Sequence, residues 1–174
     1  ICAGRSAVFT VAATGSGLIY RWRKDGNDIP GGTNATLQLV GVNSADEGQY
    51  DCVVTGCDKS VTSSAATLSV AIPPSVTEHP EGVSVCEGIS VTLTTKAEGS
   101  DLRYQWLKNG VPIIGANEST LEIQNTTFTD EGEYACRLSG TCSPQVVTDT
   151  AKVNVINPPS IDGQPEDTEL TAGD

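Results

Sequence analysis

Hydrophobic and polar residues alternate along several short segments of this 174-residue chain, and turn residues separate the segments. Residues 7–11 (Ala-Val-Phe-Thr-Val) alternate as a strand with one buried face does. Residues 37–39 and 67–70 show the same pattern, and residues 24–28 hold an Asp-Gly pair of the kind that tight hairpins favour. Turn signals recur about every 8–12 residues, which predicts an all-β sandwich rather than a helical fold.

One short motif occurs twice, as Asp-Glu-Gly-Gln-Tyr-Asp-Cys at residues 46–52 and Asp-Glu-Gly-Glu-Tyr-Ala-Cys at residues 130–136. In each copy a Tyr stands two residues before a Cys, so that both side chains lie on the inward face of one strand. A Trp precedes each motif, and Trp22 and Trp106 lie 84 positions apart, as the two motifs do. One unit has therefore been repeated.

The repeated unit resembles tandem immunoglobulin-like repeats, most closely those of bacterial cell-surface proteins and adhesins. The resemblance is carried in the second copy by residues 86–88, 104–110, 114–116, 121–123, 130–136 and Cys142. It implies that Tyr50 and Tyr134 form tyrosine corners, in which the hydroxyl bonds back to the preceding turn. It also implies that Trp22 and Trp106 are buried on strand C.

The period predicts two tandem immunoglobulin-like β-sandwiches plus the first strand of a third. Residues 1–72, named repeat one here, lack a strand A; residues 73–157, named repeat two, form a complete repeat; and residues 158–174 match the opening of repeat two. Pro-Pro pairs at 73–74 and 158–159 mark the links, because proline fixes the backbone and removes a hydrogen-bond donor.

Two interpretations of the tail remain open. Residues 158–174 act as a donor strand that completes repeat one of a second copy, or the ends of the chain are arbitrary limits of a longer polypeptide.

The net charge of the chain limits the classes of partner that it is expected to bind. Twenty-two Asp and Glu against ten Lys and Arg give a net charge of −12, which opposes binding to nucleic acid or to an anionic membrane. No apolar run approaches the roughly 20 residues of a membrane helix, so membrane insertion is not expected. The single histidine, His79, excludes His-based triads and multi-His metal sites, and we expect it to be solvated in a loop.

No catalytic constellation is present, so we expect no enzyme. The carboxylate pairs in the two motifs are adjacent in a turn, whereas glycosidase chemistry requires two carboxylates that face each other. No cofactor is predicted, with calcium at the junctions between repeats as an alternative. Its candidate ligands are Glu78, Glu81, Asp162, Glu166 and Asp167.

The cysteines fall at three equivalent places in each repeat, which favours an extracellular, oxidising location. Cys52 and Cys136 point inward on strand F, but Val11 and Thr95 stand where an immunoglobulin domain supplies the partner cysteine. The trans-sheet disulfide cannot form, and we expect two buried, inert thiols.

The other four cysteines lie at opposite poles of each sandwich. Cys2 and Cys86 precede strand B, whereas Cys57 and Cys142 lie in the turn after strand F. A five-residue strand separates the poles by roughly 16 Å, and disulfide Cα atoms must lie within about 7 Å. We therefore predict a Cys2–Cys142 bridge across the junction, with Cys57 and Cys86 left for preceding and following repeats. The alternative, Cys2–Cys57 with Cys86–Cys142, requires a rerouted opening strand in both repeats.

These features favour a structural or adhesive stalk or filament module of an extracellular surface protein. Its partners would be neighbouring repeats or other copies of the chain. The alternative is a recognition domain that binds a glycan or a surface protein through its BC, C–C′ or FG loops.

Overall fold

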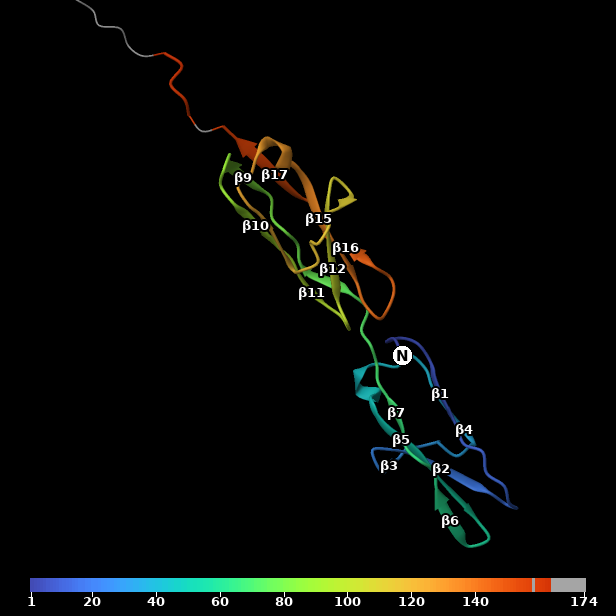
Figure 1. The fold of residues 1–174 in the computed structure, drawn as a ribbon. Helices are drawn as coiled ribbons and strands as arrows, with labels where there is room; N and C mark the ends of the chain where they lie inside the picture. The colour runs from blue at the N-terminus through green and yellow to red at the C-terminus, as the bar shows by residue number, and fades with distance from the viewer. Residues whose placement is uncertain (158, 164–174) are drawn as a thin grey trace, which may run out of the picture.

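The computed structural model describes residues 1–157 and 159–163. It contains two β-sandwiches that lie end to end, with the N-terminus beside the junction between them (Figure 1). The predicted fold class, all-β with tandem immunoglobulin-like domains, is confirmed. The predicted strand over residues 158–174 lies largely outside the described residues.

Repeat one has its sheets on either side of one core. Its elements are β1 (Ala7–Thr10), β2 (Ile19–Lys24), β3 (Asn27–Asp28), β4 (Thr36–Leu39), the short 3₁₀ helix η1 (Ser44–Asp46), β5 (Gly48–Gly56), β6 (Lys59–Thr62) and β7 (Ala66–Leu68). One sheet has the order β3-β2-β5-β6 with β7 also on β5, and the other pairs β1 with β4.

Repeat two has the same layers and additional opening strands. Its elements are β8 (Ser75–Glu78), β9 (Val83–Cys86), β10 (Val91–Thr94), β11 (Lys96–Glu98), β12 (Arg103–Lys108), β13 (Val111–Pro112), β14 (Thr120–Ile123), the 3₁₀ helix η2 (Phe128–Asp130), β15 (Gly132–Ser139), β16 (Val146–Val147) and β17 (Ala151–Ile156). The main sheet has the order β13-β12-β15-β17-β9, with β16 on β15. The opposite layer contains the pairs β10-β14 and β8-β11.

A tryptophan lies at the centre of each core, as the motif predicted. Trp22 and Trp106 retain 3% and 0% of their exposable surface. Each stands opposite the cysteine of the neighbouring strand, Trp22 beside Cys52 and Trp106 beside Cys136. The indole N–H of Trp22 donates to a backbone carbonyl at 2.8 Å, and that of Trp106 to another at 3.0 Å, so neither buried nitrogen lacks a partner.

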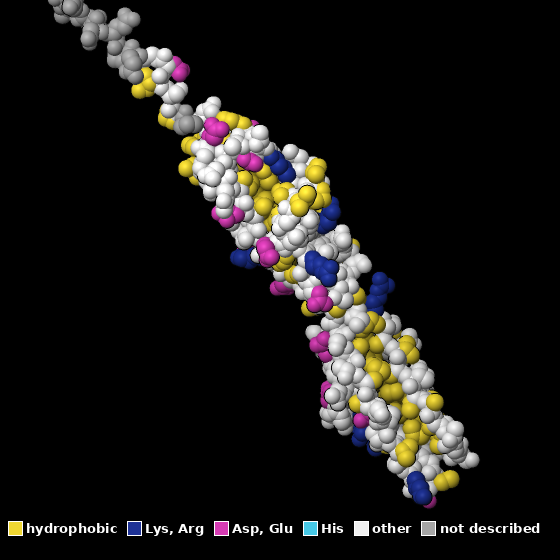
Figure 2. All heavy atoms as spheres, in the orientation of Figure 1, with side chains coloured by type: hydrophobic (Ala, Val, Ile, Leu, Met, Phe, Trp, Pro, Cys, Tyr) yellow, Lys and Arg dark blue, Asp and Glu magenta, His cyan; other side chains and the backbone are white. Residues whose placement is uncertain are grey.

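The opening strands β8 and β9 have no counterpart strand within residues 1–72. In repeat two, Thr95 is fully buried and its hydroxyl donates to the carbonyl oxygen of Glu78 on β8 at 2.7 Å. The equivalent residue of repeat one, Val11, is half-buried. Figure 2 shows hydrophobic side chains exposed in a stripe along repeat one.

Candidate functional site

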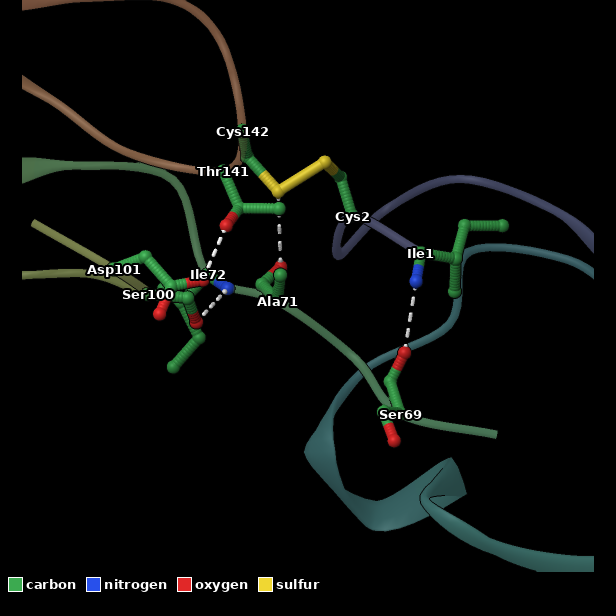
Figure 3. Close-up of a disulfide and its surroundings, with 9 residues drawn as sticks. All are labelled: Ile1, Cys2, Ser69, Ala71, Ile72, Ser100, Asp101, Thr141 and Cys142. Carbon is green, nitrogen blue, oxygen red and sulfur yellow. Dashed lines mark hydrogen bonds between the residues drawn. A yellow bond between two sulfur atoms is a disulfide. The ribbon is translucent and has the colours of Figure 1, made fainter. Parts of the chain in front are cut away.

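A disulfide crosses the junction between the two sandwiches and joins Cys2 to Cys142, whose Cα atoms lie 5.8 Å apart (Figure 3). Cys2 is held at the end of repeat one by its neighbours: the N–H of Ala3 donates to the carbonyl of Ala71 at 2.8 Å, and the N–H of Ala71 donates to the carbonyl of Ile1 at 2.7 Å. Cys142 lies in the turn between β15 and β16. The predicted junction bridge is confirmed.

The alternative pairing is wrong, because it would join opposite poles of the same sandwich. Cys57 lies in the turn between β5 and β6, at the end of repeat one that is remote from the junction. Cys86 ends β9, at the remote end of repeat two. Both are exposed and unpaired in this structure.

Ser100 of repeat two forms hydrogen bonds with the linker between the sandwiches (Figure 3). The backbone N–H of Ser100 donates to the carbonyl of Ile72 at 2.9 Å, and the N–H of Ile72 donates to the Ser100 hydroxyl oxygen at 3.0 Å. The Ser100 carbonyl in turn accepts from the N–H of Thr141 at 3.1 Å. Sequence reasoning missed this contact, because a serine in a loop carries no signal of which backbone groups it meets.

Two glycines let the linker approach repeat two closely. A Cβ at Gly99, which has φ +147°, would lie 3.0 Å from the Cα of Pro74. A Cβ at Gly140 would lie 2.6 Å from the Ser100 carbonyl oxygen and 3.4 Å from the Pro74 ring. The pole of repeat two is therefore shaped around the linker, and any larger residue would displace it.

The two predicted tyrosine corners are present. The hydroxyl of Tyr50 donates to the carbonyl of Asp46 at 2.7 Å, and that of Tyr134 donates to the carbonyl of Asp130 at 2.7 Å. Burial, followed by the negative charge of the nearby aspartate, raises the pKa of both tyrosines, that of Tyr134 to about 12. Each ring therefore remains neutral and fixes the turn before strand F.

The paired carboxylates of each corner stabilise the backbone. Asp46 accepts a hydrogen bond from the N–H of Asn43 at 2.8 Å, and Glu47 accepts one from the N–H of Val70 at 2.7 Å. The equivalent residues of repeat two make the same contacts. Their adjacency in a turn was the signal in the sequence that argued against a catalytic pair.

Cys52 and Cys136 are completely buried, with no exposed surface. Burial raises the pKa of both thiols, so that the reactive thiolate is disfavoured. They lie on the inner faces of β5 and β15 and contribute to the two cores.

His79 is exposed, and its Nδ1 accepts a hydrogen bond from the N–H of Asp149 at 2.8 Å. Among the described residues, no group of three or more His, Cys, Asp or Glu side chains is placed to hold a metal ion. Glu78 instead pairs with Lys96 at 2.6 Å. Calcium binding stays a prediction, since Glu166 and Asp167 lie outside the described residues. Over the described part of the chain, no helix has the length and apolar character needed to span a bilayer.

The sandwich topology and the two tyrosine corners define a tandem of immunoglobulin-like domains, held together by a disulfide between domains. Residues 73–139 match the sequence model of a family described as immunoglobulin domain.

Several animal proteins are similar in sequence to the chain. Hemicentin-1 of Mus musculus is 35% identical over 133 residues, which cover 66% of this chain and 2% of that protein. Neuroglian of Drosophila melanogaster is 33% identical over 111 residues, covering 60% of this chain and 8% of that protein. The chain thus spans a small part of these relatives. They are animal proteins, so the bacterial part of the resemblance finds no support among them.

A solved structure has the same arrangement of domains. The I-band fragment I67–I69 of titin superposes with a TM-score of 0.74 at 25% identity, and the match covers 90% of this chain and 62% of that one.

Proposed function

We propose that this chain is a spacer segment of an extracellular adhesion protein, in which immunoglobulin-like repeats stacked end to end hold another part of the protein at a distance. The observation that carries the proposal is the Cys2–Cys142 disulfide at the junction. A spacer must transmit position and force along its length, and a covalent bond between adjacent repeats serves that purpose.

Two attachments resist bending at the junction. The linker joins the repeats through Ile72 and Pro74, and the disulfide joins them at a second place. One attachment alone leaves a hinge, whereas two separate attachments allow bending only about the line that joins them. The hydrogen bonds between Ser100 and Ile72 further restrict the linker.

The proposed extracellular setting rests on the disulfide, because such bonds persist in oxidising compartments. Resemblance to animal cell-adhesion proteins, among them a netrin receptor of Homo sapiens 31% identical over 125 residues, supports an adhesive role. That match covers 68% of this chain and 8% of the receptor. The proposal includes no catalytic role and no bound cofactor.

Recognition of a glycan or a protein through the loops is a second candidate. The loop segment 13–18 at the remote end of repeat one consists of Ala, Thr, Gly, Ser and Leu. It contains none of the aromatic residues that supply much of the binding energy at protein interfaces, which argues against this candidate. Specific binding of the chain on a glycan array or in a pull-down would favour this candidate over the spacer.

Single-molecule fluorescence energy transfer tests the spacer. Cys57 and Cys86 are exposed thiols at opposite ends of the tandem and accept the two dyes, while the buried thiols do not compete. The chain should give one narrow distribution of distances. The Cys2→Ser/Cys142→Ser variant should give a broader distribution shifted to shorter distances, because the junction then bends.

Mild reduction of the unsubstituted chain, with the dyes attached through thioethers, is the matched control and should reproduce the variant. Equal distributions before and after loss of the disulfide would show that the bond does not stiffen the junction, and the spacer proposal would lose its support.

A further inference from the structure

The distal pole of repeat one, defined by Gly15, Ser16, Leu18, Gly56 and Cys57, contains a cleft of about 240 Å³. The side chains of Ala13, Leu18, Val54 and Val61 give the cleft an apolar lining. Gly56 and Cys57 belong to the end of β5 and the β5–β6 turn, and this turn lies at the end of repeat one that is remote from the junction (Figure 1).

Each glycine of this pole has an equivalent in repeat two that contacts the linker. Gly15 and Gly99 lie 84 positions apart and share an unusual backbone, with φ of +150° and +147°. A Cβ at Gly99 would meet Pro74, whereas a Cβ at Gly15 would meet only the side chain of Leu18. The position that the linker proline fills in repeat two is therefore open in repeat one.

The polar contact of the linker is repeated as well. Ser16 is the equivalent of Ser100, whose N–H and hydroxyl pair with the carbonyl and N–H of Ile72. Ser16 is exposed, and within the described residues its N–H and hydroxyl make no hydrogen bond. Ser16 thus presents to solvent the same donor and acceptor groups with which Ser100 binds the backbone of Ile72.

The cysteines complete the correspondence. Cys57 is exposed in the turn that is equivalent to that of Cys142, and Cys86 is the exposed equivalent of Cys2. The two turns differ by one residue: Cys57 follows Gly56 directly, whereas Thr141 separates Gly140 from Cys142. Cys57 nevertheless lines the cleft together with Gly56, and the Cys142 sulfur lies 3.5 Å from the carbonyl oxygen of Ala71 in the linker.

We propose that the distal pole of repeat one binds the end of another repeat of the type of repeat two. The cleft takes the proline-containing linker of that repeat, the Ser16 backbone and hydroxyl pair with the residue before its Pro-Pro, and Cys57 forms a disulfide with the cysteine at the position of Cys86. In this step two thiols become one disulfide, and a disulfide oxidant such as oxidised glutathione accepts the two electrons and two protons as two thiols. The inference rests on the proposed function, in which repeats stack end to end, and identifies the partner of the distal pole of repeat one.

A tandem fusion of two copies tests the proposal. Residues 1–169 of one copy are followed directly by residue 1 of the next, because residue 170 occupies the place of Ile1 in the repeat pattern. The fusion is oxidised with glutathione, alkylated and mapped by mass spectrometry without reduction. We expect a linked peptide pair that contains Cys86 of the first copy and Cys57 of the second. Alkylation of both these cysteines after oxidation would overturn the proposal.

A matched pair of variants in the second copy tests the cleft itself. Ser16→Ala removes the hydroxyl acceptor for the linker and should lower the equilibrium constant for closing the new disulfide several-fold. Ser6→Ala, an exposed serine of the same repeat outside the cleft, should leave it unchanged. Equal closing in the two variants would show that the linker does not occupy the cleft.

The two Cys2–Cys142 bonds of the fusion distinguish this inference from the proposed function. If they form and keep their own junctions stiff while Cys86 and Cys57 remain unlinked, the spacer stands and the docking proposal fails. If they form without stiffening their junctions, the spacer itself fails.

Discussion

Pulling the chain by its two ends should leave repeat one unextended as long as the junction disulfide is intact. Tension enters at Ile1, passes through Cys2 and the disulfide to Cys142, and leaves through the residues that follow. The cross-linked cysteines are 140 positions apart in sequence, so the intervening chain forms a closed loop that carries no net extension.

The size of the effect follows from the length of this loop. A fully extended chain spans at most about 3.3–3.6 Å per residue, so 140 residue steps correspond to about 460–500 Å. With the bond intact, the same two points stay 5.8 Å apart. Breaking the bond should therefore lengthen the fully extended chain by nearly the whole of that length.

The assay is force spectroscopy with handles attached through peptide tags at the two termini, which leaves every cysteine untouched. The fully extended length of the unsubstituted chain should reach only a short limit, because the loop between Cys2 and Cys142 stays closed. The fully extended length of the Cys2→Ser/Cys142→Ser variant, or of the reduced chain, should reach a long limit that includes this loop. The Cys57→Ser/Cys86→Ser variant is the control and should behave as the unsubstituted chain. An unreduced chain that extends to the long limit would refute the reasoning.

Three further predictions concern the cores and the thiols. Trp106→Ala should lower the free energy of unfolding of repeat two by about 3–5 kcal/mol in urea titrations, because the indole is fully buried; a loss below about 1 kcal/mol would contradict this. The pKa of Tyr134 is raised to about 12, so the unfolded chain releases this proton from about pH 10 while the folded chain keeps it. The free energy of unfolding should therefore fall by up to about 2 kcal/mol between about pH 10 and pH 12. Tyr134→Phe should flatten that slope in urea titrations at about pH 9 and pH 11.5, and an unchanged slope would count against a buried neutral ring. In the native protein a thiol reagent should label Cys57 and Cys86 alone, with two more thiols reacting after denaturation; four native thiols would show that the cores are open.

The sandwich and the junction bridge could be predicted because both depend on strand alternation. Alternation fixes which face each side chain occupies, and the repeated motif places Tyr50 and Trp22 in the same core. Once the strand directions were known, the poles on which Cys2 and Cys142 lie followed.

The contacts of the linker could not be predicted in the same way. Ser100 and Gly140 come from separate loops, and their meeting with the linker depends on how those loops fold back. The opening of repeat two is also divided into β8, which pairs with β11, and β9, which runs parallel to β17. Alternation of apolar residues gives no indication of which sheet an opening strand joins.

Peptide mapping of the unreduced, alkylated chain by mass spectrometry tests the central claim most directly, because it reads the covalent link across the junction. With the reagent added to the denatured chain, the structure predicts one linked pair of peptides, containing Cys2 and Cys142, with the other four cysteines alkylated. A linked pair containing Cys2 and Cys57 would place the bond within one repeat and contradict the covalently joined tandem.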